Sequence, residues 1–165
     1  EIMRYLITFS YNGSKFHGFQ RQKNVDNVQS ELENALKRVF KEDILIKGAG
    51  RTDAGVHAYA QKCHFDLNRE IEPTKIVSAL NAQLSKYIYV IDCTQVKDDF
   101  HARFSVKEKT YLYKINLGKY DTIREDYTMH LKTKVDLLKM TQASKCVVGI
   151  HDFSSFVTGR YLIHI

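Results

Sequence analysis

Ten consecutive residues, Gly48-Ala-Gly-Arg-Thr-Asp-Ala-Gly-Val-His57, hold the most reactive combination of side chains in this 165-residue chain. They combine three glycines with a carboxylate (Asp53), a guanidinium (Arg51) and an imidazole (His57). The segment lies between two stretches with strand patterns, so we expect a loop on a rigid scaffold, where reactive groups are common. Two interpretations of Asp53 remain open. It is either a turn residue that caps the backbone through its side chain, or a catalytic carboxylate.

The neighbouring residues exclude two common phosphate-binding loops. Gly50 and Gly55 have the glycine spacing of a P-loop, but Val56 and His57 stand where Lys and Ser or Thr are required. The pair Gly48 and Gly50 lacks the third glycine of a dinucleotide-binding fingerprint. Arg51 could pair with the carboxylate of Asp53, or it could hold a phosphate.

The histidines and cysteines do not predict a metal site. The possible ligands are Asp53, His57, His64, His101, His130 and His151, and no pair of them has the spacing of a known site. We therefore expect histidines exposed on a basic surface and no metal. Three cysteines, far apart in the sequence, match neither a disulfide framework nor a zinc site, which favours a reducing cytoplasm. No apolar run approaches the roughly 18 residues of a membrane span.

Composition favours a polyanionic partner. The chain is 44% hydrophobic, with a net charge of +6 and a pI near 9.1. Between residues 100 and 120, five cations face one acid, a net charge of +4. The cations are Arg103, Lys107, Lys109, Lys114 and Lys119, interleaved with Phe100, Phe104, Tyr111, Tyr113 and Tyr120. Cations neutralise phosphates and aromatic rings stack on unpaired bases. The alternative is a solvated charged loop with core tyrosines, and we favour nucleic acid because the glycine loop is present as well.

The order of predicted elements indicates an α+β fold. Alternation predicts strands over residues 4–11, 59–67 and 87–94, and a short strand over 44–47. Asp26 and Gln29 resemble a capping box that opens a helix burying Val28, Leu32, Leu36, Val39 and Phe40. Pro73 suits the first turn of a second helix, with Ile76, Val77, Leu80 and Leu84 as its apolar stripe. Strand, helix, strand, strand, helix, strand is the ferredoxin-like order, with helices on one face of an antiparallel sheet.

A second, incomplete unit is expected to follow. Residues 110–116 read as a strand, 135–148 as a helix with Leu137, Met140, Ala143 and Val147 on one side, and 161–165 as a short strand. We therefore place an N-terminal subdomain with the Asp53 loop at residues 1–99. Residues 100–165 would begin a second subdomain that carries the basic and aromatic segment.

Several sequence blocks resemble the TruA-type tRNA pseudouridine synthases. The blocks are Gly50-Arg-Thr-Asp-Ala-Gly-Val-His-Ala58, Tyr11-Asn-Gly-Ser-Lys-Phe-His-Gly-Phe-Gln-Arg-Gln22, Asn27-Val-Gln29, Phe100-His-Ala-Arg-Phe-Ser105, Lys109-Thr-Tyr-Leu-Tyr113 and Gly149-Ile-His-Asp-Phe-Ser-Ser-Phe156. They stand in the order of the family and cover nearly the whole chain. The resemblance implies the pseudouridine synthase fold, built of tandem ferredoxin-like units. It also implies a cytoplasmic, homodimeric isomerase without cofactor or metal, acting on uridines 38, 39 and 40 of the tRNA anticodon stem-loop.

The resemblance also assigns roles to residues. Asp53 matches the catalytic aspartate, Tyr111 the tyrosine that packs on the target base, and Arg51 an arginine beside the aspartate. The matched blocks and the basic segment together suggest RNA contacts by Arg21, Gln22, His57, Arg103, Lys107 and Lys109. Family members continue beyond the block that ends at Phe156, with a basic residue that pairs with the aspartate, and nothing here matches it. Two hypotheses follow: an active synthase, or a tRNA-binding fragment that cannot complete the site.

Overall fold

The computed structural model describes residues 1–156, and the strand predicted over 161–165 lies outside them. The chain divides into one compact unit over Glu1–Tyr111 and another that starts at Leu112. Each unit is described by itself.

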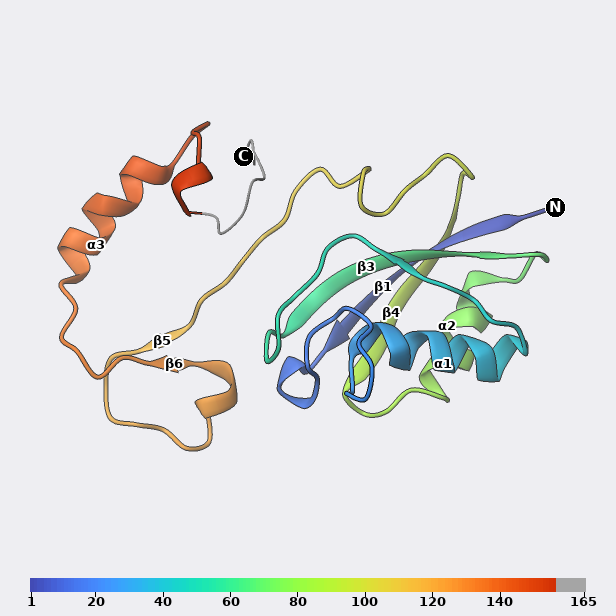
Figure 1. Ribbon diagram of the computed structural model, residues 1–165, viewed down its shortest axis with the longest axis horizontal. Helices are drawn as coiled ribbons and strands as arrows, with labels where there is room; N and C mark the ends of the chain where they lie inside the picture. Colours follow the sequence, from blue (N-terminus) through green and yellow to red (C-terminus); the bar gives the residue numbers. More distant parts are fainter. Residues whose placement is uncertain (157–165) are drawn as a thin grey trace. The chain divides into compact units, whose positions relative to one another are not determined.

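A four-stranded antiparallel sheet forms the first unit (Figure 1). Its strands are β1 (Met3–Tyr11), β2 (Lys47–Gly48), β3 (Ala58–Leu67) and β4 (Ile88–Val96), in the spatial order β2-β3-β1-β4. Two helices, α1 (Val28–Phe40) and α2 (Pro73–Asn81), complete the order β1-α1-β2-β3-α2-β4. The ferredoxin-like order is therefore confirmed, with one difference: the predicted strand over 44–47 is reduced to a two-residue pairing at 47–48.

Both helices cover the same face of this sheet, as Figure 1 shows. On β1, Tyr5, Ile7, Phe9 and Tyr11 are buried on that face. The stripe predicted for α1 is confirmed at Val28, Leu32, Leu36 and Phe40, while Val39 is half-buried. Burying each large apolar side chain contributes roughly 1.5–3 kcal/mol, so this face holds the core of the unit.

The start of α1 corrects the predicted capping box. The N-cap is Asn27 rather than Asp26, and its side-chain oxygen accepts the Ser30 amide at 2.9 Å. Asn27 is also buried, and its side-chain nitrogen donates to the Val25 carbonyl at 3.0 Å. An amide can accept and donate at once, which a carboxylate cannot. Asp26 remains exposed one residue earlier.

Two predictions for the second unit are wrong in extent. Of the strand predicted over 110–116, only β5 (Ile115–Asn116) forms, and it pairs in parallel with β6 (Met129–His130). The predicted helix is shortened to α3 (Leu137–Ser144), followed by a 3₁₀ turn at Lys145–Val147. The apolar stripe of α3 is exposed within the described residues. Within residues 1–156, no helix is long and apolar enough to span a bilayer.

Candidate active site

The loop that carries Asp53 joins two neighbouring strands at one end of the first sheet. It leaves β2 at Gly48 and enters β3 at Ala58, which pairs with Tyr11 at the end of β1. A turn forms within it, since the Val56 amide donates to the Asp53 carbonyl at 3.2 Å. Gly55 follows with φ +82°, in the left-handed region that glycine adopts most easily.

The Asp53 side chain takes no part in closing that turn. The backbone carbonyl, not the carboxylate, accepts the turn hydrogen bond. The side chain is exposed, and within residues 1–156 neither a hydrogen bond nor an ion pair holds its oxygens. An aspartate that served the turn would direct its side-chain oxygen at a nearby amide. The geometry therefore differs from that of a turn-capping aspartate and leaves the carboxylate open to solvent.

Two anchors hold the loop, one on each side of Asp53. Before it, the Thr52 hydroxyl shares a 2.7 Å hydrogen bond with the buried Tyr11 phenol, and the Thr52 carbonyl accepts the Phe19 amide at 3.0 Å. After it, the Nδ1 atom of His57 accepts the Gly13 amide at 3.0 Å. Burial raises the pKa of Tyr11, so its phenol stays protonated near neutral pH. Asp53 is thus presented on a fixed piece of backbone.

Close backbone packing explains why two distant sequence blocks occur together. A Cβ on Gly13 would lie 1.9 Å from the Val56 carbonyl oxygen, far inside van der Waals contact. The turn after β1 therefore lies directly against the Asp53 loop, and only glycine fits there. His57, predicted to contact RNA, is half-buried and uses one ring nitrogen in this packing.

Lys109 reaches the same loop from the basic segment. Its ammonium nitrogen lies 3.1 Å from the point where a Cβ would stand on Gly50. Residues 100 to 111 belong to the first unit, so this segment and the Asp53 loop share one compact body. The sequence places Lys109 and Asp53 in separate blocks and gives no signal that they would approach each other.

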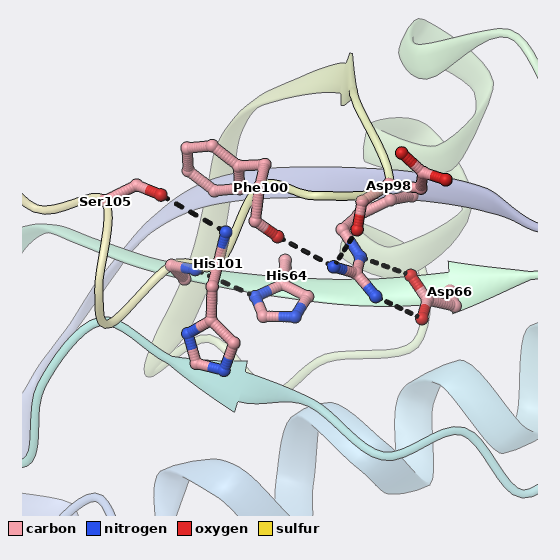
Figure 2. Close-up of polar contacts among 8 residues, drawn as sticks. His64, Asp66, Asp98, Phe100, His101 and Ser105 are labelled. Carbon is pink, nitrogen blue, oxygen red and sulfur yellow. Dashed lines mark hydrogen bonds and ion pairs between the residues drawn. The ribbon is translucent and has the colours of Figure 1, made fainter.

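A segment that we call the strap, residues 98–105, lies over β1 and β3 on the face of the sheet opposite the helices (Figure 2). Arg4 on β1 donates to the carbonyls of Asp98 and Phe100, the latter at 2.8 Å, and pairs with both carboxylate oxygens of Asp66 at 2.7 and 2.8 Å. His64 on β3 accepts the Ala102 amide at 3.0 Å. The strap is thereby attached to two neighbouring strands.

The charges under the strap shift three pKa values. The hydrogen bond between Arg4 and Asp66 lowers the pKa of Asp66 and raises the pKa of Arg4. Burial lowers the pKa of His64 to about 4, with the nearby Arg4 charge acting in the same direction. His64 is only 3% exposed, so the prediction of exposed histidines is wrong at this position. Strand alternation places it on the polar face, where Ala102 and the ring of His101 from the distant strap lie against it.

The other predicted site residues are mostly exposed. Arg51 forms no ion pair with Asp53 within residues 1–156. Arg21 pairs with Glu33 on α1, and the side chain of Gln22 donates to the His17 carbonyl at 2.8 Å. Three more are exposed along the segment that follows β4: Arg103, Lys107 and Tyr111, the last at 69%. The structure thus gathers Asp53, Arg51, His57 and Lys109 around one loop.

Among the described residues, the Asp53 loop belongs neither to a metal-binding cluster nor to either of two surface hollows. Among the described residues, no three His, Cys, Asp or Glu side chains are grouped to hold a metal ion. Two surface hollows lie elsewhere, one around Asp121 and His130 and one around Asp26 and Ser30. Asp53, Ala54 and Gly55 are themselves exposed within the first unit.

Comparison with known proteins decides the family. The sequence profile described as "tRNA pseudouridine synthase" matches residues 7–105, from β1 to the end of the strap. The chain belongs to the tRNA pseudouridine synthase family. The matched part includes the Asp53 loop, both of its anchors and His64, while Arg4 and Lys109 lie outside it.

Curated members of the tRNA pseudouridine synthase family extend the similarity into the second unit. Proteins named tRNA pseudouridine synthase A are 43% identical over 160 residues in Thermosipho melanesiensis and 44% over 156 residues in Lactobacillus delbrueckii subsp. bulgaricus. Another, from Streptococcus agalactiae, is 43% identical over 157 residues. These alignments cover 93–96% of this chain but only 60–66% of the relatives. The chain thus spans less than two thirds of their length.

Proposed function

We propose that this protein takes part in converting uridine to pseudouridine in tRNA, with Asp53 as the nucleophile. The observation that carries the proposal is an exposed carboxylate, without a partner among residues 1–156, on a doubly anchored loop inside the segment that matches the family. The names of the relatives support tRNA as the substrate. The resemblance in the sequence blocks suggests uridines 38, 39 and 40 of the anticodon stem-loop as the targets.

The reaction is an isomerisation, and its atoms balance without a cofactor. The N1–C1′ glycosidic bond breaks, the uracil rotates, and a C5–C1′ bond forms. The C5 proton leaves and N1 gains a proton, so nothing is oxidised or reduced. A single nucleophilic side chain can divide such a difficult exchange into two easier steps. Asp53 suits that role because no hydrogen bond or ion pair within residues 1–156 occupies its carboxylate oxygens.

A stacked base must first leave the helix, which costs a few kcal/mol. We propose that Tyr111 packs on the extruded base and that Arg51 positions its nucleotide. Lys109 beside the loop, together with Arg103 and Lys107, would offset the cost by contacting phosphates. We also propose RNA contacts by Arg21, Gln22 and His57, each of which makes a contact within the protein as well. We also propose that the protein acts as a homodimer in the cytoplasm.

A second candidate is a chain that binds tRNA without catalysing the isomerisation. It is favoured by the basic segment and by the exposed aromatic side chains of both units, which can bind RNA without taking part in the isomerisation. Binding and turnover must therefore be measured separately.

The test is tritium release from tRNA labelled at C5 of uridine, with binding of the same tRNA measured in parallel. Asp53→Asn should abolish release and leave affinity within about twofold, because the amide keeps the shape but is a poor nucleophile. Asp43→Asn, at a carboxylate 82% exposed in the connection after α1, is the matched control and should release tritium like the wild type. Binding without release by the wild type would favour the second candidate. Failure to bind tRNA would overturn both.

A further inference from the structure

His64 is the most deeply buried ionisable side chain on the face of the first sheet opposite the helices. It is 3% exposed, although its neighbours Lys62 and Asp66 on the same face of β3 are exposed. Across the sheet it pairs with Leu6 on β1 and Lys47 on β2. Burying an imidazole is unfavourable unless its nitrogens are used, so the contacts of His64 indicate what it does.

One contact connects His64 to the backbone of the strap. Its Nδ1 atom accepts the amide of Ala102 at 3.0 Å, and Ala102 is itself only 3% exposed (Figure 2). The rings of His101 and Phe100 lie edge-on to the imidazole, with centroids 4.8 and 6.4 Å away. An accepting Nδ1 must be unprotonated. The strap is therefore fixed at Ala102 by a neutral imidazole.

The strap residues on either side of Ala102 form a closed turn that presents Arg103. The Ser105 amide donates to the His101 carbonyl at 2.8 Å, and the His101 amide donates to the Ser105 hydroxyl at 3.2 Å. The Arg103 amide donates to Nδ1 of His101 at 3.2 Å, while its side chain is exposed. Arg4 holds the carbonyls of Asp98 and Phe100, before the turn. The hydrogen bond from the Ala102 amide to His64 thus joins the turn itself to the sheet.

We propose that His64 is a positioning residue, which fixes the turn of the strap on the sheet and thereby holds Arg103 where it contacts the phosphate backbone of RNA. The identity of the ligand rests on the proposed function. The anchoring of the turn does not, because it depends only on contacts within the first unit.

The charges that face His64 keep it an acceptor at neutral pH. Arg4 on β1, Lys47 on β2 and His101 in the strap oppose a positive charge on the ring, and only Asp66 on β3 favours one. Burial acts in the same direction and has the largest effect. Together they lower the pKa of His64 to about 4, so the Ala102 amide retains its acceptor under physiological conditions.

Two substitutions separate the hydrogen bond from simple burial. His64→Asn places an amide oxygen near the position of Nδ1 and keeps an acceptor, whereas His64→Leu fills the space without one. In the full chain, we expect His64→Leu to lower the hydrogen-exchange protection of the Ala102 amide about tenfold, as loss of one such bond implies. His64→Asn should retain most of the protection. Equal protection in the wild type and His64→Leu, or equal loss in both variants, would overturn the proposal.

Binding to an anticodon stem-loop RNA tests the consequence for Arg103. His64→Leu should reduce the salt dependence of binding as much as Arg103→Ala does, and the double variant should show no further reduction. Additive effects would mean that His64 does not act through Arg103. If the wild type binds no RNA, the proposed function fails, and the Ala102 exchange data still decide whether His64 holds the turn.

The wild-type protein provides a measurement that needs no substitution. The amide resonance of Ala102, followed by NMR as the pH falls, should titrate with the His64 ring near pH 4. An Ala102 resonance that does not move as the ring protonates would contradict the hydrogen bond, even if the His64→Leu variant failed to fold.

Discussion

The phenol of Tyr11 and the hydroxyl of Thr52 share a hydrogen bond of 2.7 Å, one residue before Asp53. Tyr11 is the last residue of the central strand β1 and is 5% exposed. The contact therefore joins a strand that is paired on both sides to the loop that carries the candidate nucleophile. Catalytic groups benefit from such support because small displacements from the reacting geometry reduce rates strongly.

Removing this hydrogen bond should loosen the loop without unfolding the protein. Tyr11→Phe should lower the free energy of unfolding by about 1 kcal/mol, the net worth of one hydrogen bond. Thr52→Val removes the partner hydroxyl. Because both substitutions eliminate the same interaction, their combined effect in urea denaturation should be smaller than the sum. Strict additivity would show that the bond does not stabilise the native state.

Close packing at Gly13 predicts that a steric clash there costs more stability than a strained backbone conformation does at Gly55. Gly13→Ala would place a Cβ 1.9 Å from the Val56 carbonyl oxygen, so the loop or the turn has to move. We expect a loss of about 3 kcal/mol, at the upper end for overpacking. Gly55→Ala is the matched control, with open space but a φ of +82°. It should cost about 1–2 kcal/mol, the usual penalty for a left-handed alanine. Equal losses in denaturant titrations would contradict this packing.

Local sequence patterns predict the first unit well because each of its strands and helices buries one side of a regular repeat. The alternation of Tyr5, Ile7 and Phe9 gives both the strand and its buried face. Short-range patterns predict the exact residue less well where neighbouring residues can fill the same structural role. Asp26 and Asn27 both qualify as N-caps, and the one chosen also donates a second hydrogen bond from a buried position.

Contacts between distant segments are what the sequence does not reveal. The burial of His64 depends on a strap that begins 34 residues later, and the approach of Lys109 to Gly50 spans 59 residues. The reduced strand before Asn116 has a similar origin. Alternation predicts that a sheet would bury the face of the strand that carries Tyr111 and Tyr113. It does not indicate whether a partner strand is present. Both side chains are exposed.

The depressed pKa of His64 predicts acid sensitivity in a defined range. The unfolded chain takes up this proton near pH 6.5 and the folded chain only near pH 4, so the unfolded state binds more protons between these values. Stability should therefore fall as pH drops from 6.5 to 4, and this contribution levels off below 4. We expect a loss of about 1–2 kcal/mol, less than roughly 1.4 kcal/mol per pKa unit would give, because solvent screens the exposed neighbouring charges.

A comparison with His64→Asn isolates this contribution from the other histidines. The free energy of unfolding, measured by denaturant titration at several pH values, should depend less steeply on pH in the variant over that range. Asp66 adds a separate loss at lower pH, since its pKa lies below 3.8 in the folded state. Identical pH profiles for wild type and variant would mean that the ring is not held neutral by the fold.

The position of Lys109 leads to a prediction about how RNA is held. Its ammonium lies beside the Asp53 loop, so a phosphate bound there would be next to the reacting nucleotide. If Lys109 and Arg103 each contact one phosphate, Lys109→Ala and Arg103→Ala should each lower the slope of log affinity against log salt by about one. Lys75→Ala is the matched control, because Lys75 is 76% exposed on α2, across the sheet from the strap. Its substitution should leave the slope unchanged. An unchanged slope for Lys109→Ala would show that this side chain does not contact RNA. Its position beside Gly50 would then reflect packing alone.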